Sequence, residues 1–246
     1  MGDVRIEGRN AVLGALRLGS EIREIYVDSR ANIDRRMGEM LSIASQRGIA
    51  VKRVERRVLD DISSTGVHMG VIAFARAPSL VTTTKQLLTS CRSKGESPFL
   101  VVIDDVVYEQ NLGAIARTAN AAGVQGIIIP RSRKGAVTPE VIRISTGAAL
   151  FTPIIEENLY SALKAMKSEG VHIVVADMDG KDLYSDANLK GSIAFVLGGE
   201  HKGVSEPMKR RCDEVVRIPM YGMVSSLNLS AACSILLYEK LRQDRS

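Results

Sequence analysis

The sequence predicts an α/β protein in two parts, and three observations lead to this prediction. From Phe99 onward, short apolar runs alternate with helical segments that carry apolar residues on one face. Apolar strands separated by helices are typical of a mostly parallel sheet covered on both faces. Residues 1–76 show the same alternation on a smaller scale, and a stretch rich in Thr, Ser and Lys follows them. We therefore expect a small domain at residues 1–77, a linker at 78–98 and a larger domain at 99–246.

The spacing of the apolar residues sets the expected elements. In the small domain we expect a helix, a strand, a helix and two strands, at residues 9–18, 24–28, 33–46, 50–54 and 70–75. In the large domain we expect strands at 99–103, 126–129, 171–176, 193–197 and 214–218. Helices are expected there at 112–122, 159–168, 206–211 and 229–242. Within the linker, a helical pattern is confined to residues 85–88.

Composition limits the class of protein. Of the 246 residues, 45% are hydrophobic and 25% are charged, which is ordinary for a globular protein. No apolar run approaches the ~20 residues of a membrane span, and the first residues lack the apolar segment of a secretory signal. We therefore expect a cytoplasmic protein that does not engage a membrane. The three cysteines and three histidines lack the spacing of metal ligands, so we expect no metal site.

The net charge of +5 is unevenly distributed along the chain. Residues 1–97 hold 16 lysines and arginines against 11 acidic residues, whereas residues 98–246 hold 17 of each. A basic domain beside a neutral one is typical of an enzyme with a polyanion-binding appendage. Solvated helix faces would give the same count, so charge alone leaves both interpretations open.

Three polar strings carry the chemistry of the large domain. They are Asn-Leu-Gly-Ala-Ile-Ala-Arg-Thr-Ala at 111–119, Leu-Gly-Gly-Glu-His-Lys-Gly at 197–203, and Ile-Pro-Met at 218–220 followed by Ser-Ser-Leu-Asn at 225–228. Each lies at a strand end or a helix start, where open α/β sheets expose backbone groups to ligands. The second string is neither a P-loop nor a dinucleotide-binding glycine loop, because the spacing differs from both. Asn111 is also an ordinary capping residue for a helix that begins at Leu112.

In this order, the strings resemble the three motifs of the SpoU (TrmH-type) RNA 2'-O-methyltransferases, especially the group that methylates a guanosine of large-subunit ribosomal RNA. The resemblance implies a trefoil-knotted C-terminal domain and a ribosomal-protein-like N-terminal domain that binds the RNA substrate. It also implies S-adenosyl-L-methionine as cofactor, a ribose hydroxyl as acceptor, and a homodimer paired through the last helix. That helix carries more apolar residues than one buried face requires, although a two-sided core helix is the alternative. One departure is Glu109-Gln110, where the family usually has proline before the asparagine.

The resemblance assigns roles to ten residues. The implied catalytic residues are Asn111, Arg117, Glu200, Ser226 and Asn228. The implied cofactor-binding residues are Leu197, Gly198, Ile218, Met220 and Leu227. The family's usual account makes Arg117 the base, but a guanidinium stays protonated, so anchoring a phosphate and stabilising the alkoxide is the alternative role.

Three other functions stay open at this point. The first is ribose methylation of transfer RNA, and the second is methylation of a base nitrogen, which the asparagine–arginine motif disfavours. The third is a non-catalytic RNA-binding or ribosome-assembly protein of the same fold. The five implied catalytic side chains argue against the third function, since a protein without the activity has no reason to retain them all.

Overall fold

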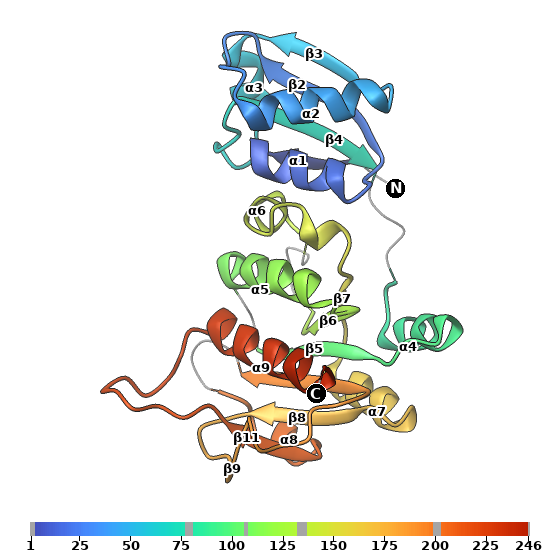
Figure 1. The fold of residues 1–246 in the computed structure, drawn as a ribbon, viewed down its shortest axis with the longest axis vertical. Helices are drawn as coiled ribbons and strands as arrows, with labels where there is room; N and C mark the ends of the chain where they lie inside the picture. The colour runs from blue at the N-terminus through green and yellow to red at the C-terminus, as the bar shows by residue number, and fades with distance from the viewer. Residues whose placement is uncertain (1–2, 77–80, 106–107, 132–136, 199–202, 246) are drawn as a thin grey trace. The chain divides into compact units, whose positions relative to one another are not determined.

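A computed structural model describes residues 3–76, 81–105, 108–131, 137–198 and 203–245 of the chain (Figure 1). The chain forms two compact units, Met1–Ser79 with Val137–Phe151, and Leu80–Ala136 with Thr152–Ser246. Two features differ from the expected division. Residues 84–94 of the expected linker form a helix of the second unit, and residues 137–151 pack with the first unit.

The first unit is built on a four-stranded sheet in the order β1-β4-β2-β3. Its strands are β1 (Asp3–Glu7), β2 (Ile22–Asp28), β3 (Ala50–Val54) and β4 (Val71–Arg76). β4 is antiparallel to both β1 and β2, and β2 is parallel to β3. Its helices are α1 (Arg9–Arg17), α2 (Arg35–Gln46), α3 (Arg56–Ile62) and α6 (Pro139–Ile144), followed by a 3-10 turn at Ala148–Leu150. The helices and strands expected from periodicity are present, and β1, α3 and α6 are additional.

Close backbone contact joins α1 to the turn after α6 within the first unit. A Cβ atom placed on Gly14 would lie 2.1 Å from the carbonyl oxygen of Thr146, so only glycine fits there. Gly147 has a φ of 90°, and a Cβ atom on it would lie 3.0 Å from the nitrogen of Ala15. Ile142 and Leu150 complete the apolar core that α1 and α2 form against the sheet. Two glycines therefore let residues 137–151 add a layer to this unit.

The second unit is built on a seven-stranded sheet in the order β7-β6-β5-β10-β8-β11-β9, with every pair parallel. Its strands are β5 (Phe99–Asp104), β6 (Gly126–Ile129), β7 (Ile154–Glu156), β8 (His172–Ala176), β9 (Asp182–Leu183), β10 (Ile193–Gly198) and β11 (Glu214–Arg217). Its helices are α4 (Thr84–Lys94), α5 (Glu109–Ala122), α7 (Leu159–Ser168), α8 (Glu206–Lys209) and α9 (Leu229–Asp244). The predicted parallel α/β architecture is confirmed.

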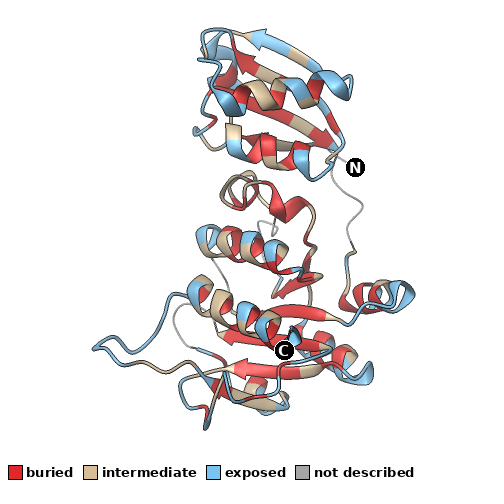
Figure 2. Cartoon of the chain, viewed as in Figure 1, coloured by how far each residue is buried: buried red, intermediate tan, exposed pale blue. Residues whose placement is uncertain are grey.

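Helices cover both faces of this sheet, and its central strands are buried (Figure 2). α4 and α7 pack on one face, where their apolar side chains meet alternate residues of the central strands. α5 and α9 pack against one another, and α9 contacts β10 while α5 contacts β6. β5 and β10 pair in register from Phe99 with Ile193 to Asp104 with Gly198. Because parallel strands end at a common edge, this register brings the segments that follow β5, β8, β10 and β11 together.

The length and apolar character of the helices in the described ranges bear on whether the chain could span a bilayer. None of them is long and apolar enough to cross a membrane.

A buried carboxylate anchors the end of β1 in the first unit. Glu7 is fully buried and accepts hydrogen bonds from Ser63 Oγ at 2.7 Å and from Ser64 N and Oγ at 2.7 and 2.8 Å. Thr65 donates from N at 3.2 Å and from Oγ1 at 2.5 Å. Burial alone would raise the pKa of Glu7, but these hydrogen bonds outweigh it and lower the pKa to about 2. The ionised carboxylate thereby ties β1 to residues 63–65.

Replacing Glu7 with Gln should lower the free energy of unfolding by about 2–3 kcal/mol near neutral pH, because the amide turns an NH2 group toward hydrogen-bond donors. The folded pKa lies below the ordinary value of 4.5, so the stabilisation is complete above that pH and is lost as the pH falls toward about 2. Urea unfolding of both proteins at about pH 7 and about pH 3 measures this effect. The difference should shrink at the lower pH, and an equal difference at both would contradict the assignment.

Candidate functional site

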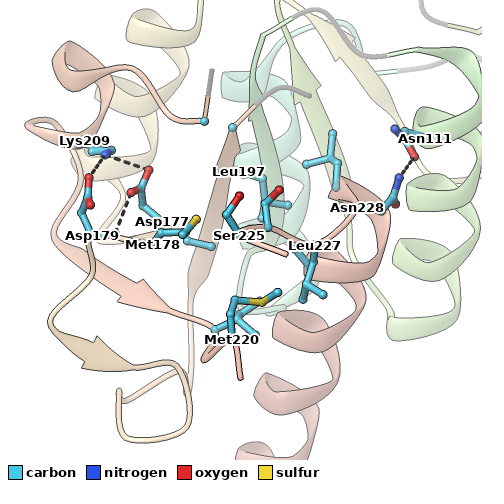
Figure 3. A pocket seen from close by; sticks show the side chains of 17 residues that line it. Asn111, Asp177, Met178, Asp179, Leu197, Lys209, Met220, Ser225, Leu227 and Asn228 are labelled. Atoms are coloured by element: carbon cyan, nitrogen blue, oxygen red, sulfur yellow. Dashed lines mark hydrogen bonds and ion pairs between the residues drawn. The ribbon is translucent and has the colours of Figure 1, made fainter. Parts of the chain in front are cut away.

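A cavity of about 740 Å³ opens at the carboxyl edge of the second unit's sheet (Figure 3). Its walls come from the ends of β8 and β10, from the segments after β8, β10 and β11 and from the start of α9, with single residues from α5 and α8. The lining residues are Asn111, Ala176, Asp177, Met178, Asp179, Leu197, Gly198, Gly203, Lys209, Ile218, Met220, Ser225, Ser226, Leu227, Asn228, Leu229 and Ala232. All five residues that the resemblance assigned to the cofactor are in this set. The structure therefore brings parts of all three sequence motifs to one cavity.

The base of the cavity depends on a contact between two glycine backbones. A Cβ atom on Gly198 would lie 2.1 Å from the carbonyl carbon of Gly203 and 2.4 Å from its Cα. No side chain fits at that distance, which explains why β10 ends on glycine. Gly203 itself has a φ of 64°, in the left-handed region that glycine adopts without strain.

Asp104 holds the chain immediately after this glycine pair. It is the last residue of β5 and lies opposite Gly198 in the sheet register. Its Oδ2 accepts hydrogen bonds from Ser205 N at 2.8 Å and from Ser205 Oγ at 2.6 Å. Ser205 directly precedes α8, so this contact fixes where the helix begins.

An ionic cluster forms one wall of the cavity, at the left of Figure 3. Lys209 Nζ lies 2.9 Å from Asp177 Oδ2, 3.5 Å from Asp179 Oδ2 and 3.3 Å from Glu206 Oε1. The Lys209 and Asp177 side chains are only 14% and 11% exposed, so solvent screens this pair weakly. Burial opposes the charged form of Lys209, but the hydrogen bonds to Asp177 and Glu206 prevail and raise its pKa.

Sequence reasoning missed this cluster, although one signal was available. Asp177 and Asp179 form an Asp-x-Asp string directly after a buried strand, where the carboxyl edge of a parallel sheet is expected. The partner Lys209 lies 32 positions further along and belongs to a very short helix, so no local pattern connects it to them. Among the described residues, no group of three His, Cys, Asp or Glu side chains is placed to hold a metal ion.

Two asparagines join the first and third motifs on the opposite wall (Figure 3). Asn228 caps α9, since its Oδ1 accepts hydrogen bonds from Ser230 N at 2.9 Å and Ala231 N at 3.4 Å. Its amide nitrogen is thereby left to face α5, and it donates to Asn111 Oδ1 at 3.0 Å. The cap thus sets the orientation of the amide that contacts Asn111.

The expected start of this helix at Leu112, with Asn111 as its cap, is wrong. α5 begins at Glu109 with Tyr108 as its N-cap residue, so Asn111 is the third residue of the helix and not its cap. Glu109 and Gln110, which replace the family's usual proline, are good helix formers, and an acid in the first turn is favourable near the positive end of the helix dipole. The helix therefore extends further toward its N-terminus than the apolar pattern indicates.

The remaining catalytic candidates differ in their placement. Ser226 lines the cavity and is exposed. Arg117 is exposed on α5 and is not among the lining residues. It lies six positions after Asn111, which corresponds to about 9 Å along the helix axis and about 240° around it. The two therefore project from different faces of α5. Glu200 lies outside the described residues.

Comparisons with known proteins were made by family model, by sequence and by structure. The model described as the SpoU rRNA Methylase family matches residues 98–238. A second model, described as RNA 2'-O ribose methyltransferase substrate binding, matches residues 5–81.

Curated relatives cover nearly the whole chain. A putative TrmH family tRNA/rRNA methyltransferase of Bacillus subtilis, YacO, is 32% identical over 96% of this chain and 94% of its own length. The 23S rRNA (guanosine-2'-O-)-methyltransferase RlmB of Shewanella oneidensis is 37% identical over 87% of this chain and 86% of its own length.

Solved structures agree with these relatives. A crystal structure described as an RNA 2'-O ribose methyltransferase is 27% identical, with a TM-score of 0.79 over 98% of this chain and 88% of that one. An AdoMet-bound rRNA methyltransferase of Sinorhizobium meliloti is 25% identical, with a TM-score of 0.72 over 98% of this chain and 87% of that one. From the fold, the motifs gathered at one cavity and these matches, we conclude that the chain belongs to the SpoU rRNA methylase family.

Proposed function

We propose that this protein transfers a methyl group from S-adenosyl-L-methionine to the ribose 2'-oxygen of a guanosine in large-subunit ribosomal RNA. The observation that carries the proposal is the single cavity that gathers Asn111 with residues of the second and third motifs. The Shewanella relative, named for that reaction, supports the choice of ribosomal RNA. The Bacillus relative is named for both tRNA and rRNA, so a transfer-RNA ribose is the alternative substrate.

The residues that line the cavity fit this cofactor. A volume of about 740 Å³ lies within the usual range for small-molecule sites. Apolar side chains of Leu197, Ile218 and Leu227 offer a surface for the adenine ring, and Gly198 lets a ligand approach the backbone. The carboxylates of Asp177 and Asp179 are acceptors for ribose hydroxyls or for an ammonium group. When bound, S-adenosyl-L-methionine supplies an electrophilic methyl group, and the reaction needs no metal.

The chain's own residues would position and activate the acceptor. A guanidinium stays protonated in proteins, so the side chain of Arg117 can hold the phosphate beside the target ribose and stabilise negative charge that develops on the 2'-oxygen. The same protonation makes it a poor proton acceptor. Asn111 and Asn228 hold one another in place, and Ser226 offers a hydroxyl on the same wall. Glu200 would orient Arg117 or the nucleotide, as the resemblance implies.

The proposal also includes a homodimer and a trefoil knot in the second unit, both of which the resemblance implies. In the last helix, Leu236 and Leu237 are buried within the chain, so they do not by themselves require a partner. The segment between β11 and α9 supports pairing better: it extends from the second unit (Figure 1), and Tyr221 and Met223 are 95% and 105% exposed. Such exposed apolar side chains mark an interaction surface. Arg117 does not line the cavity of its own chain. In a dimer, the Arg117 of one chain would serve the cavity of the other.

The substrate is tested by mapping ribose methylation in total cellular RNA with and without this protein. One guanosine of large-subunit ribosomal RNA should lose its 2'-O-methyl group in cells that lack the protein. Loss at a transfer-RNA ribose would establish the alternative substrate. No change at any ribose would overturn the proposal and favour a non-catalytic RNA-binding role.

Two variants should separate chemistry from cofactor binding. Arg117→Ala should lower turnover about 100-fold or more and leave cofactor affinity nearly unchanged, because its contacts are with RNA and the transition state. Gly198→Ala should instead abolish cofactor binding, since the added Cβ would collide with Gly203. Calorimetric titration with S-adenosyl-L-methionine and single-turnover methyl transfer measure the two effects. Wild-type turnover in Arg117→Ala would remove this residue from the mechanism.

A pair of substitutions at Asn228 should distinguish its structural role from its role in the site. Asn228→Ala removes the cap of α9 and should reduce stability by about 1 kcal/mol. Asn228→Asp keeps an oxygen for the cap and should be about as stable as the native chain, but it loses the donor to Asn111. Both should have reduced turnover. Full turnover in a stable Asn228→Asp protein would show that the asparagine pair does not serve the reaction.

Sedimentation tests the dimer. The native chain should be a dimer at micromolar concentration, and Tyr221→Asp with Met223→Asp should shift it toward monomer with little loss of folding, because both side chains are exposed. Tyr238→Asp, also at an exposed position, probes α9 in the same way. A native chain that sediments as a fully active monomer would exclude the dimer.

A further inference from the structure

One edge of the first unit's sheet gathers segments from across that unit. β1 and β2 are both antiparallel to β4, and β3 is parallel to β2, so β1, β2 and β3 end at the same edge where β4 begins. Backbone hydrogen bonds connect these ends: Gly8 N donates to Val71 O at 3.0 Å, and Asp28 N to Gly70 O at 2.9 Å. Ser29 N donates to Val54 O at 2.8 Å. Side chains from the three strand ends therefore share one surface.

This edge carries six exposed arginines, which we call the arginine edge. Arg30 follows β2, Arg35 and Arg36 begin α2, Arg53 is the last residue but one of β3, and Arg56 and Arg57 begin α3. None of them makes an ion pair within the described part of the chain. Six other basic residues of the same unit each pair with an acid, namely Arg9, Arg17, Arg23, Lys52, Arg76 and Arg143. Apart from Arg5 and Arg47, the basic side chains of this unit without an ion pair among the described residues are thus gathered at one edge.

The acids near the arginine edge offset only part of its positive charge. Asp34 accepts a hydrogen bond from Met37 N at 2.8 Å and pairs with Arg9 at 2.9 Å. Asp60 is engaged by His68 at 2.8 Å. Glu55 and Asp61 are the remaining exposed acids beside six arginines. A net positive surface of arginine forks suits phosphate oxygens, which arginine can contact in pairs.

Exposed apolar side chains lie among these arginines. Met69 and Ile33 are 65% and 55% exposed, and both belong to loops at this edge. Met69 has a φ of 49°, in the left-handed region that residues other than glycine rarely adopt. It is held there because Arg9 Nε donates to its carbonyl oxygen at 3.2 Å and the adjacent Gly70 N donates to His68 Nδ1 at 3.1 Å. The fold thus fixes an apolar side chain outward beside a cluster of cations.

The open face of the same sheet offers a contrast. It carries aromatic residues, Tyr26 and Phe74, whose ring centroids are 5.7 Å apart. However, Lys52 lies over the Tyr26 ring and pairs with Glu24 at 2.6 Å, and Arg5 lies over the Phe74 ring. Both rings are thus already covered, and this face carries less unpaired positive charge than the arginine edge. Charge complementarity therefore favours the arginine edge.

We propose that the arginine edge is the surface through which the first unit binds RNA, with arginines on the phosphates of an unpaired segment and Met69 and Ile33 against its exposed bases. The proposal rests on the proposed function, from which RNA follows as the partner. Unpaired RNA fits better than a duplex, because single-stranded loops expose bases to apolar side chains while a paired helix presents mainly phosphates and hydroxyls.

Matched triple variants test the position of the charge. Arg30→Gln, Arg56→Gln and Arg57→Gln together remove three charges from the arginine edge. Arg17→Gln, Arg23→Gln and Arg76→Gln remove three from paired arginines of the same unit, so both proteins have the same net charge. The probe is large-subunit ribosomal RNA transcribed in vitro, and affinity is measured by filter binding over a range of salt concentrations.

The edge variant should bind this RNA about tenfold more weakly or worse, and its log–log salt slope should fall by about 2, at roughly 0.7 for each lost phosphate contact. The control variant should stay within about twofold of the native chain, since its three arginines are paired with acids and lie outside the arginine edge. Equal losses in the two variants would reduce the effect to net charge and overturn the proposal. Native RNA affinity in both variants would overturn the proposal as well.

Met69→Gly tests the apolar part without endangering the fold, because glycine adopts the positive φ freely and thermal stability should be unchanged or higher. Its affinity should fall for an RNA hairpin with an unpaired loop but not for a blunt duplex with the same number of phosphates. A similar change for both RNAs, or for neither, would contradict a base contact at Met69.

The proposed function and the proposed RNA-binding surface can be disproved independently. If the native chain does not methylate ribosomal RNA, the proposed function falls, while the comparison of the two triple variants in binding still decides the surface. Titration of each variant with S-adenosyl-L-methionine should give native affinity, because the substitutions lie outside the cavity of the second unit. A loss of cofactor affinity in the edge variant would also count against the proposal.

Discussion

The contact between the backbones of Gly198 and Gly203 is the constraint on which the candidate site depends. It allows Gly203 to lie directly against the end of β10, a strand near the middle of the sheet. Asp104 then fixes Ser205, and Lys209 is brought within 2.9 Å of Asp177. One wall of the cavity therefore depends on Gly198, where no side chain fits, and on Gly203, whose φ of 64° favours glycine.

The opposite wall follows from a helix cap. Asn228 must satisfy the free N–H groups at the start of α9, and this requirement fixes which end of its amide faces Asn111. The residue that caps the helix is thus also the one for which we propose a role in the site. Sequence alone could not separate the two roles, because asparagine is common at N-caps whether or not a ligand is near.

The strands and long helices were predictable because their apolar periodicity is strong: residues 126–129 and 159–168 have the predicted bounds. β1 and α3 escaped prediction, since β1 alternates charged and apolar residues over only five positions and α3 is short and rich in charge. The placement of Asn111 was wrong by a turn because helix starts depend on capping more than on periodicity. The Lys209–Asp177 pair was unpredictable, as it depends on tertiary packing alone.

Charge on the first unit shows why composition gave only part of the answer. The excess of basic residues in the N-terminal part fits either a binding surface or ordinary solvated helices, and counting cannot decide between them. Pairing can: arginines such as Arg17 that face an acid are locally neutralised, whereas Arg56 and its neighbours at the arginine edge are not. Because the potential felt by a phosphate falls off within about a Debye length, local imbalance matters more for binding than net charge. The partition of the arginines, which only the fold reveals, therefore carries the information on where a polyanion binds.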